Sequence, residues 1–278
     1  MNEKRLSKFL QSVKPEPEYN NFLAGKSVAI VGPSKHILLE NNGRKIDDCD
    51  VVIRLKWLPR KEQNQFAEHI GNKTNVMYSS VINSKTDYDF LSRTNINFTR
   101  HPVCELGVGL NSKMYHDICA SSYSSEQYAF ILKDYATENG WTDNKLASIN
   151  SKSKYSIWPQ LGFNAVMESI ASDAKHVYIT GLTMYHGGGH MLQKNKPPSH
   201  NKAIVEKHNG LLETLILLDT IEYLDAFGKR IETDNVLTKI LNSYRVSDIP
   251  TDPATRKQLY ISLMKTLSDD INNLVRDL

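Results

Sequence analysis

Short apolar runs that end at turn-forming residues limit what this chain of 278 residues can fold into. Residues 28–31 (Val-Ala-Ile-Val) form such a run, which stops at Gly32-Pro33-Ser34. Similar runs occur at 51–55, 75–78, near 96–98 and at 176–181, and helical spacing occurs at 162–172 and about 201–219. Runs of this length bounded by glycine and proline are typical of buried strands. Strands that alternate with helices predict an α/β fold with a mostly parallel sheet flanked by helices.

The two ends of the chain have helical patterns that stand apart from this alternation. Residues 3–13 predict a short surface helix followed by a polar linker, and the tail from Thr233 onward predicts two more helices. We therefore expect three parts: an N-terminal helix and linker (1–25), a main α/β domain (26–228) and a C-terminal helical extension (229–278). The weaker patterns of the middle region predict helices around 112–121 and 125–138.

Composition argues against several classes of protein. A formal net charge of +3, with no basic run flanked by aromatics, argues against nucleic acid as a partner. The three cysteines, Cys49, Cys104 and Cys119, are scattered and form no CxxC pair, which suggests a reducing compartment. The polar N-terminus lacks a signal-peptide pattern, and no segment approaches the roughly 20 apolar residues of a membrane span. These features predict a cytoplasmic protein, although the C-terminal helices leave a peripheral membrane contact open.

Two loops are candidates for holding a phosphate. Gly32-Pro33-Ser34 follows the first strand, at the edge where open α/β sheets bind ligands, and Ser34 can cap a helix whose first N–H groups are free. Pro159-Gln160-Leu161-Gly162 is a rigid turn before a helix, and its glycine lets a ligand approach closely. Neither loop is a GxGxxG or P-loop motif, so neither specifies a dinucleotide or a triphosphate. Each loop taken alone also fits an ordinary structural turn.

Histidines supply the candidate proton chemistry. His190 follows a glycine-rich segment after a strand end, where functional residues concentrate, and His208 begins the apolar-faced part of a helix. A neutral imidazole can accept a proton from a hydroxyl nucleophile, so His208 is the candidate general base. Glu213 lies five residues further on and is not on the same helix face, so we do not expect it to orient His208. The histidines expected on the surface are His36, His69, His101, His116 and His176.

Three patterns resemble metal sites but lack the context that such sites need. Asp48-Cys49-Asp50 leads straight into a strand, and Asp87-Tyr88-Asp89 lies in a polar turn without a supporting loop. His186 and His190 lack a nearby third ligand for zinc. We therefore predict that the protein holds no metal.

Taken in order, these segments resemble the sialyltransferases of glycosyltransferase family 29. The long motif of that family appears here as Val31-Gly32-Pro33-Ser34, then Ile46 to Arg54, then Gly71-Asn72-Lys73-Thr74. The short motif is similar to Pro159-Gln160-Leu161-Gly162 through Thr180-Gly181-Leu182, and the later histidines match His190 and His208, the latter with Glu213. The resemblance covers about residues 26–220. The Gly-Pro-Ser loop is also similar to that of bacterial sialyltransferases of family 42.

The resemblance implies a single Rossmann-like domain of the GT-A-variant sialyltransferase type. It implies an inverting, metal-independent enzyme that moves a sialic acid, or a related 2-keto sugar acid such as Kdo, from a CMP-sugar to a hydroxyl of a glycan or glycolipid. The CMP-sugar is the donor substrate, and no cofactor is expected. His208 then acts as general base, and His190 stabilises the departing phosphate.

The same resemblance implies a donor site made of Gly32, Pro33, Ser34, Arg54, Lys56, Gln160, Leu161, Gly162, Gly181 and Leu182. This chain departs from the family pattern inside that site. Pro33 and Lys56 stand where the family has asparagine, and Gln160-Leu161 replaces a Ser-Thr pair. These changes leave the identity of the sugar acid open.

Two alternatives come from other classes of protein. A methyltransferase would be another nucleotide-binding α/β enzyme, but Arg54-Leu55-Lys56 stands where its acidic ribose contact would follow the second strand. A catalytically inactive sugar- or partner-binding module fits the altered loop residues. Binding of S-adenosylmethionine in place of CMP favours the first alternative, and CMP binding without turnover favours the second.

Overall fold

The computed structural model describes residues 3–55, 65–78, 96–102, 121–123, 160–189, 191, 210–245 and 248–278. The helices expected around 112–121 and 125–138 lie almost wholly outside these residues. So does the start of the long helix expected from residue 201.

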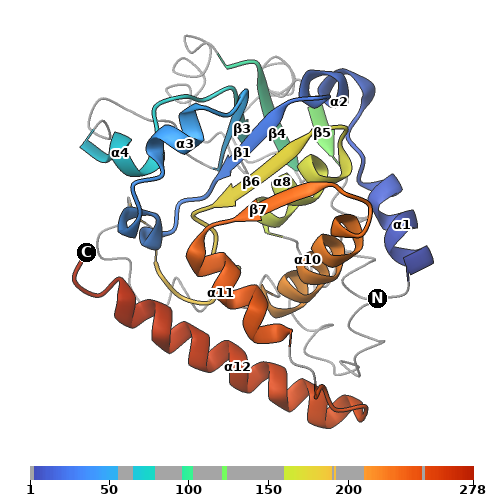
Figure 1. Cartoon of the computed structure of the whole chain (residues 1–278), viewed down its shortest axis with the longest axis vertical. Coiled ribbons are helices and arrows are strands. Elements are labelled where there is room, and N and C mark those ends of the chain that lie inside the picture. Colours follow the sequence, from blue (N-terminus) through green and yellow to red (C-terminus); the bar gives the residue numbers. More distant parts are fainter. Residues whose placement is uncertain are drawn as a thin grey trace, which may run out of the picture.

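The core of the protein is one parallel sheet of seven strands in the order β5-β4-β3-β2-β1-β6-β7 (Figure 1). The strands are β1 (Ser27–Val31), β2 (Val51–Leu55), β3 (Val76–Tyr78), β4 (Phe98–Pro102), β5 (Ser121–Tyr123), β6 (His176–Thr180) and β7 (Arg230–Thr233). The expected α/β fold with a mostly parallel sheet is therefore confirmed. The sequence patterns did not predict β5 or β7, and β7 lies beyond residue 228, in the part expected to be helical.

The order of the strands reverses at β1. From β1 the chain builds outward through β2 and β3 to one side, and it later returns to place β6 on the other side of β1. In open α/β sheets the crevice at such a reversal, outside the carboxyl ends of the strands, is where ligands bind. The loops that follow β1 and β6 meet at this place.

Helices cover both faces of the sheet, as alternate strand residues require. The helices are α1 (Glu3–Ser12), α2 (Pro17–Leu23), the 3-10 helix η1 (Lys35–Leu39), α3 (Gly43–Asp47), α4 (Ala67–Ile70), α8 (Leu161–Ala171), α10 (Gly210–Asp225), α11 (Asn235–Tyr244) and α12 (Pro253–Leu274). Val28 and Ile30 point into the larger cluster, which contains α1, α2, α8, α10, α11 and α12. Ala29 and Val31 point into the smaller cluster, with η1, α3 and α4.

Both ends of the chain belong to the packed core. The helix expected at 3–13 is present as α1, but it is not a surface helix, because Leu6, Phe9 and Val13 are buried in the larger cluster. The two C-terminal helices are present as α11 and α12, which pack on α10 and on each other (Figure 1). Among the helices that the structure describes, none is both long enough and apolar enough to cross a membrane.

Candidate functional site

The loops after β1 and β6 touch through two glycines. Gly32 donates its N–H to the carbonyl of Thr180 at 2.8 Å, and Ser34 donates its N–H to the carbonyl of Gly181 at 3.0 Å. A Cβ atom on Gly32 would lie 2.2 Å from the Gly181 oxygen, well inside van der Waals contact. Gly181 has a φ of +70°, in the left-handed region that favours glycine. Two glycines are therefore needed here for the backbones to meet.

Leu182 joins this pair of loops to the start of α8. Its Cδ2 atom would lie 2.5 Å from a Cβ atom on Gly32 and 3.0 Å from one on Gly162. Leu55, at the end of β2, approaches the same Gly162 position, at 3.2 Å. The structure thus brings together Gly32, Gly162, Gly181 and Leu182, four residues of the expected donor site that are up to 150 positions apart in the sequence.

The N-terminus of α8 is held by Glu213 of α10. Gln160 occupies the N-cap position of α8, and its side chain makes no capping hydrogen bond. Instead, Oε1 of Glu213 accepts the backbone N–H of Gln160 at 2.9 Å. Burial raises the pKa of the Glu213 carboxyl well above its ordinary value. Glu213, the last residue of the family's closing motif, therefore links the short-motif helix to α10.

A glycine-rich loop covers the Ser34 segment. Gly187, Gly188 and Gly189 all have positive φ, at +89°, +84° and +58°. The N–H of Gly188 is bound by the side chain of Asn272 on α12, at 3.0 Å. The Gly189 carbonyl accepts the N–H of Lys35 at 3.3 Å, so the C-terminal helix and the first loop both hold this glycine loop in place.

The same loop carries two strained residues and a buried histidine. Met184 and Tyr185 have φ values of +48° and +63°, which are uncommon for residues with side chains and cluster at functional sites. His186 is fully buried: Nδ1 faces the Thr183 carbonyl at 2.9 Å and Nε2 faces the Tyr244 hydroxyl at 2.8 Å. Burial lowers the pKa of His186 to about 4. His186 is therefore a neutral structural group that ties the loop to α11.

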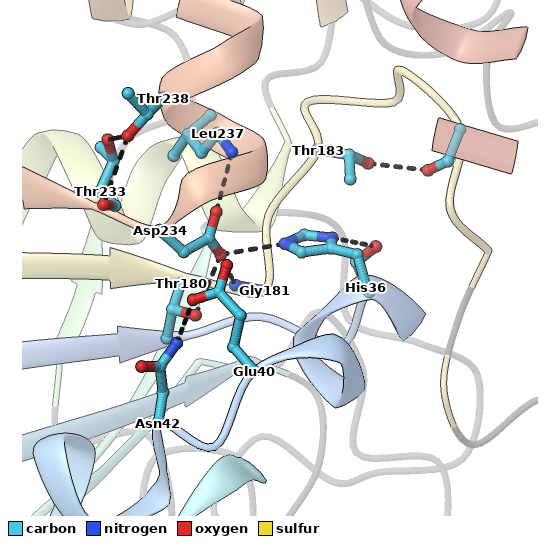
Figure 2. Close-up of polar contacts among 12 residues, drawn as sticks. His36, Glu40, Asn42, Thr180, Gly181, Thr183, Thr233, Asp234, Leu237 and Thr238 are labelled. Atoms are coloured by element: carbon cyan, nitrogen blue, oxygen red, sulfur yellow. Dashed lines mark hydrogen bonds and ion pairs between the residues drawn. The ribbon is translucent and has the colours of Figure 1, made fainter. Parts of the chain in front are cut away.

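His36 is not a surface residue, contrary to the expectation from sequence. It lies on η1 with 1% of its surface exposed. Its Nδ1 is 2.9 Å from the Ser34 hydroxyl and its Nε2 is 2.9 Å from the Asp234 carboxylate. Figure 2 shows the imidazole directed at Asp234, which also receives hydrogen bonds from Thr180 and Gly181 at the end of β6. Hydrophobic patterning gave no sign of this because Asp234, the partner of Nε2, lies 198 residues away in the sequence.

Arg54 points into the protein and holds the third part of the long motif. The side chain is fully buried, and it donates hydrogen bonds to the carbonyls of Ile70 and Lys73 and to the hydroxyl of Thr74. Asp47 accepts the N–H groups of Asn72 and Lys73 in the same segment. In this structure Arg54 and Asp47 thus hold the backbone of residues 70–74, and Arg54 also binds the hydroxyl of Thr74.

The first acidic pattern also serves the fold. The Asp50 carboxylate accepts both the N–H and the hydroxyl of Ser27, each at 2.8 Å, at the start of β1. Asp48 is exposed and lies 3.8 Å from Arg44. Within the part of the chain that the structure describes, no group of three or more metal-ligating side chains is assembled. His190, His208, Lys56 and the second acidic pattern at 87–89 lie outside the described residues.

Comparison with known proteins supports the resemblance drawn from the motifs. The model of glycosyltransferase family 29 (sialyltransferase) matches residues 1–107, less than half of the chain but including all three parts of the long motif. No curated protein sequence matches the chain.

Two solved structures are similar over most of the chain. A mammalian sialyltransferase in complex with Gal-beta-1-3GalNAc-ortho-nitrophenol aligns with a TM-score of 0.44 and 15% identity, over 84% of this chain and 79% of that chain. A second mammalian sialyltransferase structure aligns with a TM-score of 0.46, at the same identity and coverage. Over residues 1–107 the chain is therefore similar to glycosyltransferase family 29 (sialyltransferase).

Proposed function

We propose that the protein transfers a sialic acid or a related 2-keto sugar acid, such as Kdo, from a CMP-sugar to a hydroxyl of a glycan or glycolipid. The observation that carries this proposal is the meeting of Gly32, Gly181, Leu182 and Gly162 at the strand-order reversal. This is the edge at which α/β sheets hold nucleotides. The family match over residues 1–107 supplies the class of reaction.

In the proposed mechanism the start of α8 faces the phosphate of CMP. The backbone N–H groups of a first helical turn carry partial positive charge, which favours an anion there. A CMP-sugar has a single phosphate as its leaving group, so modest charge stabilisation from these amides and from His190 is enough for its departure. The proposed mechanism therefore requires no metal ion.

His208 is the proposed general base. It precedes by five residues Glu213, which is anchored to the N-cap of α8. His208 would take the proton of the acceptor hydroxyl as that oxygen attacks the anomeric carbon, and the CMP phosphate would leave from the opposite face. The configuration at the anomeric carbon is inverted in such a single displacement. Ser34, Gly181 and Leu182 line the nucleoside side of the site.

Ligand-dependent thermal stability tests the nucleotide part of the proposal. CMP, CDP, UDP, GDP and S-adenosylmethionine are each added in high excess, and a ligand at about 100 times its Kd adds about 2.7 kcal/mol of stability. We expect a shift with CMP and then turnover of CMP-sialic acid or CMP-Kdo. Stabilisation by a diphosphate only in the presence of a divalent cation, or by S-adenosylmethionine alone, contradicts the proposal.

Substitution of the proposed base tests the catalytic part. We expect His208→Ala to lower kcat by about 10²–10⁴ while CMP still binds. His176→Ala is the matched control, because His176 lies at the amino end of β6, the edge of the sheet away from the site. Near-normal turnover by the His208→Ala enzyme contradicts the assignment of His208 as general base.

A cytoplasmic location is part of the same proposal and is checked by cell fractionation.

A further inference from the structure

Three buried side chains form a chain of hydrogen bonds that begins at Ser34, in the loop after β1, and ends at Asp234, directly after β7. Ser34 follows β1, His36 lies on η1, and Asp234 caps α11, 198 residues away from His36. The two contacts of the imidazole are both 2.9 Å, and all three residues are less than 10% exposed. The proposed reaction gives no role to His36 or Asp234.

The surroundings of Asp234 fix the direction of these hydrogen bonds. Its Oδ2 atom accepts from the Thr180 hydroxyl at 3.0 Å and from the Gly181 N–H at 2.8 Å, and its Oδ1 atom accepts from the Leu237 N–H at 2.8 Å. Burial acts to raise the pKa of Asp234, but the hydrogen bonds from His36 and the two amides outweigh it and lower the pKa below its ordinary value. An ionised carboxylate only accepts, so Nε2 of His36 must carry the hydrogen.

Whether Nδ1 carries a hydrogen decides what the Ser34 hydroxyl can do. In a neutral imidazole with hydrogen on Nε2, Nδ1 is an acceptor. The Ser34 hydroxyl, 2.9 Å away, then donates its hydrogen to Nδ1. Its oxygen is left with lone pairs and no hydrogen to offer, so it accepts hydrogen bonds from a ligand and does not donate them.

We propose that Asp234 and His36 are positioning residues of the nucleotide site: with Nε2 bound to Asp234, Nδ1 accepts the hydrogen of the Ser34 hydroxyl and holds the Ser34 oxygen as a hydrogen-bond acceptor for the nucleoside. The ligand group that fits this oxygen is a donor, such as a ribose hydroxyl or the cytosine amino group, and not a phosphate oxygen. This inference rests on the proposed function for its ligand. It adds two residues, outside the family's motifs as they match this chain, that act on the ligand through Ser34.

The glycine loop leaves space only for a bare backbone next to this hydroxyl. A Cβ atom on Gly188 would lie 2.8 Å from the Ser34 oxygen. Gly188 is itself held by Asn272 of α12. The hydroxyl is therefore fixed from two sides, by the imidazole and by the glycine loop.

A double-mutant cycle on nucleotide binding tests whether His36 acts through Ser34. Calorimetry measures the Kd of CMP and of cytidine for the wild type, Ser34→Ala, His36→Phe and the double variant. We expect each single variant to weaken CMP binding about 5- to 10-fold, as for one hydrogen bond. The double variant should be no weaker than either single variant, because the two changes remove the same interaction. The Kd of cytidine, which has no phosphate, should rise by the same factor.

Two further variants complete the test. His36→Gln keeps an N–H for Asp234 and a carbonyl oxygen for Ser34, so it should restore CMP affinity; it also decides the matter where His36→Phe fails to fold. Thr220→Val removes a buried hydroxyl on α10, which bonds to the Ile216 carbonyl, and should leave CMP affinity unchanged.

The outcomes separate this inference from the proposed function. The positioning role is overturned if the factors by which the two single substitutions weaken CMP binding multiply in the double variant. It is also overturned if Ser34→Ala weakens CMP binding while His36→Phe leaves the Kd unchanged. A loss seen with CMP but not with cytidine overturns the assignment of Ser34 as an acceptor for the nucleoside. A wild-type protein that binds neither ligand overturns the proposed function, and this inference with it.

Discussion

Glu213 and Gln160 are joined by a buried hydrogen bond of 2.9 Å, from the Gln160 N–H to Oε1 of the glutamate. This bond fixes the first turn of α10 against the start of α8. Neither residue is more than 8% exposed, and the second carboxyl oxygen of Glu213 has no hydrogen-bond partner among the described residues. The first turn of α10 and the proposed phosphate-binding helix α8 are thus connected through one buried side chain.

Glu213 makes the stability of the protein depend on pH. The unfolded chain releases the proton of this carboxyl near pH 4.5, whereas burial raises the pKa of Glu213 in the folded protein. The contribution of Glu213 to the free energy of unfolding is therefore fully present below about pH 4.5. It is lost as the pH rises toward the folded pKa, at up to about 1.4 kcal/mol per pH unit. We expect Glu213→Gln to remove this loss, so that in urea unfolding the variant gains stability relative to the wild type as the pH rises above about 5.

The control for this prediction is Glu222→Gln on the same helix. Glu222 forms a surface ion pair with Arg245, with half of its side chain exposed. Its substitution should change stability by about 1 kcal/mol or less, with little dependence on pH. A constant difference between Glu213→Gln and the wild type across this range would show that Glu213 is ionised in the folded protein.

His186 gives the opposite dependence on pH. It is buried and neutral, with a pKa lowered from 6.5 to about 4. The unfolded chain therefore binds a proton at a pH where the folded protein does not, and stability falls as the pH drops from about 6.5 to about 4. The loss reaches about 3 kcal/mol at most. We expect His186→Gln to remove this part of the acid sensitivity, measured by urea unfolding; an unchanged acid slope contradicts the assignment.

Local sequence patterns predicted the strands nearest the site but not the edges of the sheet. Residues 28–31 and 51–53 are continuous apolar runs because both faces of β1 and β2 are covered by helices. β7 is an edge strand of four residues whose side chains are half-buried or exposed, and its sequence, Arg-Ile-Glu-Thr, carries almost no apolar signal. Its place is set by pairing with β6, which lies far away in the sequence.

The glycines of the site were predictable and its polar contacts were not. Gly32, Gly162 and Gly181 each follow a strand or begin a helix, so their convergence follows from the topology of a parallel sheet. The burial of His36 depends on Asp234, and nothing local in the sequence pairs the two. A sequence also gives no direction to the Arg54 side chain, whose partners at residues 70–74 become visible only in the fold.

A buried network of ion pairs around β4 should contribute strongly to the stability of the protein. Arg100 on β4 is fully buried and binds Glu168 of α8 with two hydrogen bonds, of 2.7 and 2.8 Å, and Glu16 at the start of α2 at 2.7 Å. Arg100→Met leaves Glu168 buried without its cation. We expect this variant to lose about 3–5 kcal/mol of stability.

Two comparisons decide whether the loss comes from the unpaired carboxylate. Arg100→Met combined with Glu168→Leu should be more stable than Arg100→Met alone, because no buried charge remains. Lys14→Met breaks the exposed pair with Asp173 and should cost about 1 kcal/mol or less. Equal unfolding free energies for the single and double Arg100 variants would show that charge burial is not the cause.

Gly188 and Gly189 separate the need for space from the need for backbone freedom. Both have positive φ, so an alanine at either position strains the backbone by about 1–2 kcal/mol. At Gly188 the added Cβ atom meets the Ser34 oxygen, at 2.8 Å, whereas at Gly189 no atom of the described residues lies within 4 Å of it. We expect Gly188→Ala to weaken CMP binding about 10-fold or more, since the hydroxyl must move, and Gly189→Ala to lower Tm slightly without changing the Kd of CMP. The two Kd values, measured by calorimetry at a temperature where both variants are folded, provide the check. Equal effects of the two substitutions on CMP binding would mean that the loop acts through its backbone conformation and not through its contact with Ser34.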